Sequence, residues 1–250
     1  MTDASKTLNG SGTEAAVLQR LATRAMGLTG ADIERIVRDA RSKARRGKRP
    51  MCYDDIEDGI RNDRPPVPVD LRWRFAVHEA GHAVVHHALN LGPIRGLNID
   101  TGQGGYNLLG YHSSGTDTAE WFENMLTMIM AGRAAEALVL KHISAGCGGA
   151  DDSDLARATR MAFDMERSLG FGAEYPLLYR PHRSPADVLD RDPELAARVH
   201  HRLEKAKERA TAVLGERWNA FDTLTKALFD AQVLDGTVVM HILDNGRDRN

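Results

Sequence analysis

The chain has 250 residues, which is enough for one sizeable core and a smaller appendage, so we expect two units. Hydrophobic residues make up 42% of it and charged residues 27%, as is typical of a soluble globular protein. The 33 Lys and Arg residues are balanced by 35 Asp and Glu residues, which excludes a strong overall positive charge that would favour nucleic acid.

The N-terminal part is expected to be helical after a flexible tail. Residues 1–13 are small and polar and predict the tail. Apolar residues at helical spacing predict a helix over residues 14–26, a second helix from Thr29 and a short third helix over residues 53–60. A proline-rich linker over residues 64–69 separates these helices from the rest of the chain.

The turn between the first two helices reads Leu28-Thr29-Gly30-Ala31-Asp32. With this turn, residues 14–63 resemble the C-terminal helical lid of an AAA ATPase, which covers the nucleotide. The chain contains no G-x-x-x-x-G-K-[ST] loop to bind phosphates. We therefore expect ATP to act only through an ATPase core that this chain lacks.

A basic run lies within the lid-like segment. It contains no interleaved aromatic residues and is flanked by acidic residues, so we interpret it as a solvated helix face and not as a nucleic-acid site. The residues of the run are Arg38, Arg41, Lys43, Arg45, Arg46, Lys48 and Arg49.

The sequence His78-Glu79-Ala80-Gly81-His82 fits the pattern H-E-x-x-H. On a helix, residues four apart share a face, so the two imidazoles can bind one zinc ion. Asp70 as N-cap and the apolar residues that follow at helical spacing predict this helix. Gly81 in its interior indicates that another backbone or a ligand packs closely there. The alternative is a buried helix whose histidines only form hydrogen bonds.

Glu79 is the expected general base. Zinc lowers the pKa of its bound water to about 7, so the Glu79 carboxylate can accept a proton and the hydroxide can attack a peptide carbonyl polarised by the ion. His86 lies about 12 Å along the helix from His78 and is not expected to share the ion. Val85 and Ala88 stand where the longer metzincin pattern requires Gly and His, so the third ligand comes from elsewhere.

Residues 93–112 predict a β-hairpin beside the zinc helix, with a turn at Gly102-Gln103-Gly104-Gly105. A strand with a free edge near the metal can hold an extended peptide through backbone hydrogen bonds. An ordinary edge hairpin is the alternative. The expected substrate strand consists of Tyr106, Asn107, Leu108, Leu109 and Gly110.

A long helix is expected over residues 117–141. Glu136 falls on an otherwise apolar face of this helix, and a buried carboxylate needs a partner. The partner is either Arg133, three residues earlier, or the second ring nitrogen of His78 or His82.

A glycine-rich loop over residues 143–150 leads into a helix that ends near Leu169. Three aspartates at the start of this helix, Asp151, Asp152 and Asp154, are common capping residues. One of them can instead be the third zinc ligand, because the helix N-terminus favours a carboxylate and the glycines let the loop approach the ion.

The C-terminal part is expected to pack as helices without chemistry of its own. Residues 181–190 predict a mobile loop. Helices are expected over residues 195–214 and 218–231, with a break at Gly215.

Several motifs occur in order after HEAGH: Ala131-Gly132-Arg133-Ala134-Ala135-Glu136, Ile143-Ser144-Ala145-Gly146, Asp154-Leu155-Ala156-Arg157-Ala158-Thr159 and Pro176-Leu177-Leu178-Tyr179. With them, residues 14–245 resemble the FtsH-type, AAA-linked zinc metallopeptidases. The resemblance implies that His78, His82 and Asp154 bind the zinc. Three residues, Asp151-Asp152-Ser153, stand where the family commonly has two, which leaves Asp151 and Asp152 as alternatives.

The resemblance also implies a mainly α (α+β) fold: a helical zinc-peptidase domain over residues 70–245, with a small β-hairpin or sheet beside the H-E-x-x-H helix. The lid-like helices precede this domain, and residues 246–250 form a tail. The implied function is a zinc-dependent endopeptidase, with one Zn²⁺ per chain, that serves as the proteolytic part of an ATP-dependent, hexameric machine acting on unfolded polypeptides. The alternative is a non-catalytic assembly or regulatory fragment that retains a structural zinc site.

Cys52 and Cys147 lie far apart and suggest neither a disulfide framework nor a cysteine zinc site, so we expect a reducing compartment. The sequence has no apolar signal region, and no run reaches the roughly 18 apolar residues that cross a bilayer. We expect a soluble chain without membrane or nucleic-acid contact. It would lie in the cytoplasm or, by resemblance, at the cytoplasmic face of the inner membrane.

Overall fold

The structure is a computed structural model that describes residues 11–64, 66–101, 104–112, 117–180 and 184–246. It is mainly helical with one small antiparallel sheet, which confirms the expected fold class. Its helices and strands, together with one 3-10 turn (η1), are, in chain order, α1 (Ser11–Arg24), α2 (Gly30–Arg46), α3 (Tyr53–Asn62), α4 (Val69–Ala88), β1 (Ile94–Asn98), β2 (Tyr106–Leu109), α5 (Ala119–Ile129), α6 (Ala131–Val139), η1 (Ala145–Cys147), α7 (Asp154–Arg167), α8 (Pro185–Leu189), α9 (Pro193–Glu216), α10 (Trp218–Ala231), β3 (Val233–Asp235) and α11 (Gly236–Asn245).

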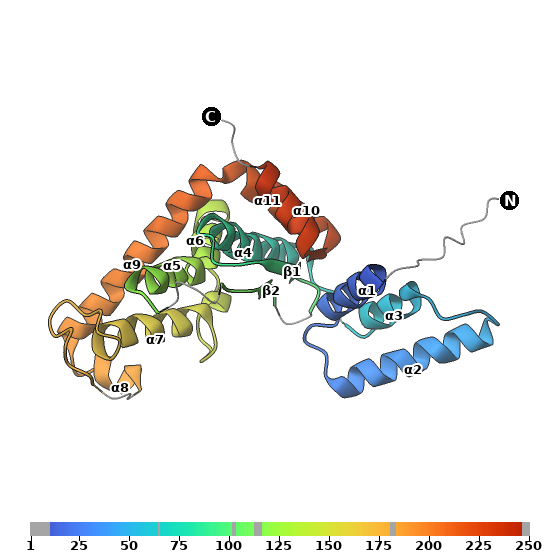
Figure 1. Ribbon diagram of the computed structural model, residues 1–250, viewed down its shortest axis with the longest axis horizontal. Helices are drawn as coiled ribbons and strands as arrows, with labels where there is room; N and C mark the ends of the chain where they lie inside the picture. Colours follow the sequence, from blue (N-terminus) through green and yellow to red (C-terminus); the bar gives the residue numbers. More distant parts are fainter. Residues whose placement is uncertain (1–10, 65, 102–103, 113–116, 181–183, 247–250) are drawn as a thin grey trace.

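Helices α1 to α3 form a separate group at one end of the molecule (Figure 1). Helix α2 begins with a capping box, in which Thr29 Oγ1 accepts from the Asp32 amide at 3.2 Å and the Asp32 carboxylate accepts from the Thr29 amide at 3.0 Å. Helix α1 begins at Ser11, so the last residues of the predicted tail are helical, whereas residues 1–10 lie outside the described residues.

Two side chains fasten this group to the rest of the protein. The Asn98 amide in β1 donates to the Thr23 carbonyl at 2.6 Å. The guanidinium of Arg64 donates to the Met26 carbonyl at 2.5 Å and also to the Asp100 carbonyl. Helix α1 therefore ends against the sheet, with the Thr23 carbonyl of its last turn bound by β1 and the Met26 carbonyl of the following turn bound by the segment before α4.

The sheet has the strand order β2-β1-β3, with both pairs antiparallel. Strands β1 and β2 form the predicted hairpin, with Asn98 opposite Tyr106, while two residues of its predicted turn lie outside the described residues. Strand β3 was not predicted, because its three residues are too few for a period-2 pattern. It pairs with the far side of β1, which leaves β2 at an edge of the sheet.

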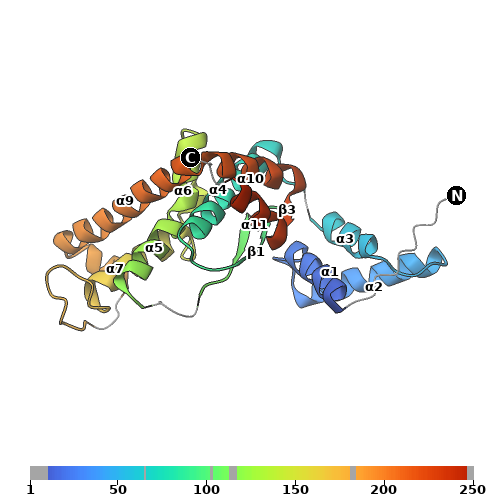
Figure 2. The ribbon, with the colours of Figure 1, turned by 45° about the horizontal axis from the view of Figure 1, so that its top comes forward.

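Helix α4 lies in the middle of the larger part, between α6 and α10 (Figure 2). Trp73 packs edge-to-face on Phe229 of α10, with ring centroids 5.4 Å apart. A Cβ atom on Gly81 would lie 2.7 Å from Ala135 Cβ and 2.9 Å from the Ala131 carbonyl oxygen. The predicted close approach at Gly81 is thus confirmed, and it is made by the backbone of α6.

Four details of the predicted elements were wrong. Helix α4 begins at Val69, so Asp70 lies in its first turn and not at the N-cap. The predicted helix over residues 117–141 is two helices, α5 and α6, separated at Met130, and Thr118 caps the first. Within the predicted loop over residues 181–190, Pro185 starts the short helix α8, because proline fits the first helical turn. Helix α9 continues through Gly215, since its packing outweighs the cost of one glycine.

None of the described helices is long and apolar enough to cross a membrane.

Candidate metal centre and active site

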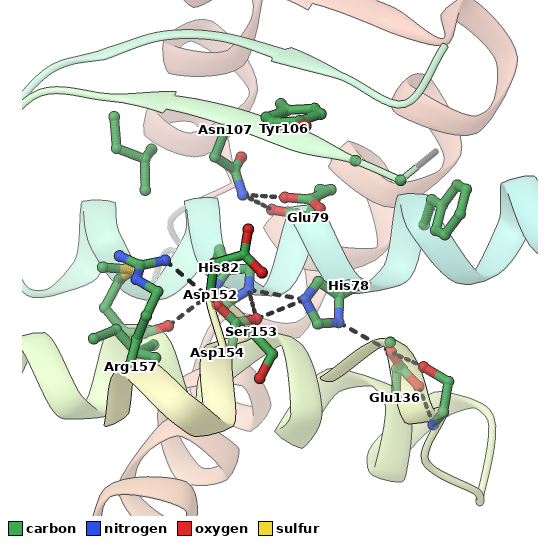
Figure 3. A pocket seen from close by; sticks show the side chains of 18 of the residues that line it. His78, Glu79, His82, Tyr106, Asn107, Glu136, Asp152, Ser153, Asp154 and Arg157 are labelled. Atoms are coloured by element: carbon green, nitrogen blue, oxygen red, sulfur yellow. Dashed lines mark hydrogen bonds and ion pairs between the residues drawn. The ribbon is translucent and has the colours of Figure 1, made fainter. Parts of the chain in front are cut away.

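Three side chains from two distant parts of the sequence meet at one point (Figure 3). His78 Nε2 and His82 Nε2, one turn apart on α4, lie 3.0 Å from each other. Asp154 Oδ2, at the N-terminus of α7, lies 3.0 Å from the first and 3.1 Å from the second. Ligand atoms arranged tetrahedrally around zinc at about 2.0–2.1 Å are roughly 3.3 Å apart, so the donor set fits zinc closely.

The orientation of the two imidazoles is fixed by hydrogen bonds at their Nδ1 atoms, which point away from the meeting point. His82 Nδ1 lies 2.8 Å from the Met128 carbonyl oxygen, and His78 Nδ1 lies 3.0 Å from Glu136 Oε1. Both partners can only accept hydrogen bonds, so the neutral imidazoles carry their protons on Nδ1. When both rings are neutral, two Nε2 lone pairs and one carboxylate oxygen converge with no proton between them, an arrangement that a cation stabilises.

The carboxylate of Glu136 is buried and collects donors from several elements. Oε1 lies 3.0 Å from His78 Nδ1 and accepts from the Cys147 thiol at 3.2 Å. Oε2 accepts from the Ser144 amide at 2.8 Å and from Arg74 Nη1 at 3.1 Å. Burial opposes ionisation, but the hydrogen bonds from His78, Ser144 and Cys147 outweigh it and lower the pKa of Glu136 to about 2.

Glu136 therefore contacts the outer nitrogen of His78, as one of the two sequence interpretations expected. Its ion-pair partner is Arg74 of α4 instead of Arg133 of its own helix. The sequence could not reveal Arg74, because spacing within one helix says nothing about a second helix. The carboxylate also ties the loop that precedes α7 to the first histidine, through Ser144 and Cys147.

Glu79 is buried beside the two histidines and faces the strand β2. The side-chain amide of Asn107 donates to the Glu79 carboxylate and lies 3.4 Å from the Glu79 carbonyl oxygen. Burial raises the pKa of Glu79, and the neighbouring histidines only partly offset this effect. A carboxylate with a raised pKa is suited to accepting and returning a proton near neutral pH.

Two glycines let the backbone approach the side chains of His78, His82 and Glu79. A Cβ atom on Gly132 would collide with the His78 ring and would lie 2.6 Å from His82 Nε2. A Cβ atom on Gly105 would collide with the Glu79 carboxylate. Gly132 is the second residue of α6, so the first turn of this helix contains a position where only glycine fits against both imidazoles.

The three aspartates before α7 have different environments. Ser153 is the N-cap, and its hydroxyl accepts from the Ala156 amide at 3.3 Å. Asp154 is therefore the first helical residue, and its carboxylate points to the histidines. Asp151 and Asp152 are exposed. The geometry favours Asp154 over the two alternatives as the third ligand.

His86 lies outside this cluster, as expected from its distance along α4. Its Nε2 lies 3.1 Å from the Gly92 carbonyl oxygen, and its ring packs edge-to-face on Tyr111. Burial lowers the pKa of His86 to about 4, so it is neutral at physiological pH.

A cleft of about 470 Å³ opens over the three donors, between the edge strand β2 and the start of α7. Of the predicted substrate strand, Tyr106, Asn107 and Leu109 line this cleft, whereas Leu108 and Gly110 do not. Strand residues alternate between the two faces, so Asn107 and Leu109 share the face towards the cleft and Leu108 lies on the other face, while Tyr106 reaches the cleft at the end of the strand. The strand presents its open edge and part of one face to the metal centre.

Comparison with known proteins gives one family and many relatives. The model of peptidase family M41 matches residues 70–242. The chain is 30% identical to the ATP-dependent zinc metalloprotease FtsH of Synechococcus sp. (strain JA-2-3B'a(2-13)) over 91% of its length, and 31% identical to FtsH 1 of Thermoanaerobacter sp. (strain X514) over 92%. It spans only 39% and 41% of the length of these two relatives.

Proposed function

Because this chain belongs to peptidase family M41, we propose that it is a zinc-dependent endopeptidase and the proteolytic part of an ATP-dependent protein-degrading machine. The observation that carries the proposal is the convergence of His78 Nε2, His82 Nε2 and Asp154 Oδ2 beneath an open cleft, with Glu79 beside them. Three ligands and an open position are typical of catalytic zinc sites, whereas structural sites are closed by four.

The bound zinc would polarise the scissile carbonyl and lower the pKa of a water molecule. Glu79 accepts a proton from the attacking water and returns it to the leaving amine. Asn107 orients Glu79 by donating to its carboxylate. Glu136 holds the His78 ring, and the edge strand β2 aligns an extended peptide through backbone hydrogen bonds.

The other parts of the proposal rest on the resemblance to FtsH-type proteins. Helices α1 to α3 correspond to an AAA lid, and an ATPase core outside this sequence delivers unfolded polypeptides to the cleft. Six copies form the working assembly, in the cytoplasm or at the cytoplasmic face of the inner membrane. The chain by itself is expected to cleave unfolded proteins and to leave folded ones intact.

Degradation of unfolded casein by the zinc-loaded chain tests this function. We expect cleavage that stops with a chelator and returns with zinc. Glu79→Gln should retain zinc and lose cleavage, since the amide keeps the shape of the side chain but cannot accept a proton. If wild type with one zinc per chain leaves casein intact, the alternative of a non-catalytic fragment with a structural zinc holds.

A further inference from the structure

Two arginines on α7 extend the cleft beyond the metal centre. Arg157 lines the cleft together with Leu109 and Tyr111, which continue the edge strand β2. It also borders a second hollow of about 330 Å³, which it shares with Arg160. The two arginines are three residues apart and lie on the same side of α7. A peptide that follows β2 past Leu109 would approach Arg157, and Arg160 follows it in the adjoining hollow.

The Arg157 side chain is loosely held. Its Nη1 lies 3.6 Å from Asp154 Oδ1, which is longer than a hydrogen bond, and half of the side chain is exposed. Arg74, the other arginine of the cleft, contacts Glu136 at 3.1 Å and His142 at 2.7 Å. Arg157 rises from α7 beside Asp154 and towards β2 (Figure 3), where its guanidinium can contact a peptide.

The second hollow is lined by both apolar and positively charged side chains. Phe122, Met161 and Leu169 supply apolar surface. Its charged residues are Arg157, Arg160 and Asp164, which leaves one excess positive charge. An acidic side chain with an aliphatic stem, such as glutamate, fits this combination, because the stem covers apolar atoms and the carboxylate meets the arginines.

We propose that Arg157 and Arg160 form a subsite that selects an acidic side chain of the substrate on the Leu109 and Tyr111 side of the scissile bond. The proposal rests on the proposed peptidase function and names a substrate preference of that same cleft. Asp154 lies next to Arg157 but is directed to the histidines through Oδ2, so the subsite and the metal centre use different atoms.

Cleavage-site mapping tests the preference. A library of unfolded peptides is digested, and the residues around each cut are counted by mass spectrometry. Wild type should favour Asp or Glu at one fixed position on one side of the cut by about fivefold over Asn or Gln. The double variant Arg157→Gln, Arg160→Gln should lose this preference, and Arg157→Glu should favour Lys at the same position. Lys226→Gln, on α10, is the control and should behave as wild type.

A binding measurement separates this inference from catalysis. Zinc-loaded Glu79→Gln binds fluorescent peptides that differ only by Glu or Gln at one position, and anisotropy gives the Kd at low salt. We expect tighter binding of the Glu peptide, with the difference lost in the Arg157→Gln, Arg160→Gln background and reduced by salt. Equal affinities for the two peptides at every position would overturn the subsite, whether or not the wild type cleaves them.

Discussion

Two buried carboxylates, one in each part of the molecule, have similar surroundings. Asp55 in the N-terminal helices accepts from both terminal nitrogens of Arg49 at 2.6 Å, and from the amide and thiol of Cys52. Glu136 in the larger part likewise accepts from an arginine, a backbone amide and a cysteine thiol. Asp55 thereby starts helix α3, and its contacts stay within the N-terminal helices.

The difference is one histidine. Glu136 also contacts His78, whose other nitrogen faces His82 and Asp154, so its charge acts on a potential metal ligand. The same kinds of donor therefore surround a carboxylate that caps a helix in one part and a carboxylate that holds a potential metal ligand in the other. The two carboxylates differ in one further contact, which is the contact of Glu136 with His78. Equivalent substitutions in the two parts should therefore have different effects on zinc binding.

The largest expected effect is the loss of a metal ligand. Asp154→Asn should weaken zinc binding by more than about 100-fold, since even the loss of a partner behind a ligand costs about 10–100-fold. Asp152→Asn should leave the affinity near wild type, because this residue is exposed. Competition with a chelator gives the affinities. A greater loss in Asp152→Asn than in Asp154→Asn would contradict the assignment.

Next comes a pair of glycines, one in each part. Gly132→Ala places a methyl group against both imidazoles and should destabilise the fold by about 1–3 kcal/mol with loss of zinc. Gly30→Ala, at the start of α2, has nothing within 4 Å and should be neutral or stabilising by about 0.5 kcal/mol. Urea unfolding and metal content test both. A stable Gly132→Ala protein with full zinc is the result that contradicts the close approach of α6.

A smaller effect is expected from the two carboxylates themselves. Glu136→Gln should lower zinc affinity by about 10–100-fold, because the amide no longer holds the His78 Nδ1 proton as strongly. Asp55→Asn should leave zinc affinity unchanged, since none of its contacts reaches the metal centre. Equal zinc affinities in the two variants would remove the distinction between these carboxylates.

The smallest effect is a pH dependence confined to the N-terminal helices. Hydrogen bonds from Arg49 and the Cys52 amide hold the pKa of Asp55 well below its ordinary value of 3.8. The ion pair of Asp55 with Arg49 therefore stabilises α2 and α3 fully at pH values above the ordinary Asp pKa of 3.8. This stabilisation is lost as the pH falls from 3.8 towards the lowered pKa of Asp55. Protection of the α2 and α3 amides from hydrogen exchange, relative to the intrinsic rate at each pH, should fall below about pH 4 in wild type and depend less on pH in Asp55→Asn. Asp58→Asn, at an exposed pair with Lys43, is the control.

Much of the metal centre could be predicted because its strongest evidence is local. The H-E-x-x-H spacing brings His78 and His82 to one face of α4, and Gly81 inside the helix predicted a close neighbour, which is α6. The choice of Asp154 as the third ligand depended on the resemblance to a known family, because a loop of variable length precedes it and spacing alone could not select it. Their roles as zinc ligands stay predictions that the substitutions above test.

Contacts between distant segments were beyond the sequence. Arg74 pairs with Glu136, 62 residues away, and no periodic pattern links the two. Strand β3 pairs with the edge of β1, and its three residues are too few to show a strand pattern in the sequence. The close approach of Gly132 to the two imidazoles likewise joins segments that are distant in the sequence.

The attachment of the N-terminal helices has a consequence for how freely this sequence can diverge. Asn98 and Arg64 donate to the main-chain carbonyls of Thr23, Met26 and Asp100, and every amino acid carries such a carbonyl. Substitutions at the three accepting positions therefore keep the hydrogen bonds, whereas substitutions at the two donating positions remove them. Besides the ion pair of Arg20 with Asp235, the hydrogen bonds of this junction are therefore encoded in the side chains of Arg64 and Asn98.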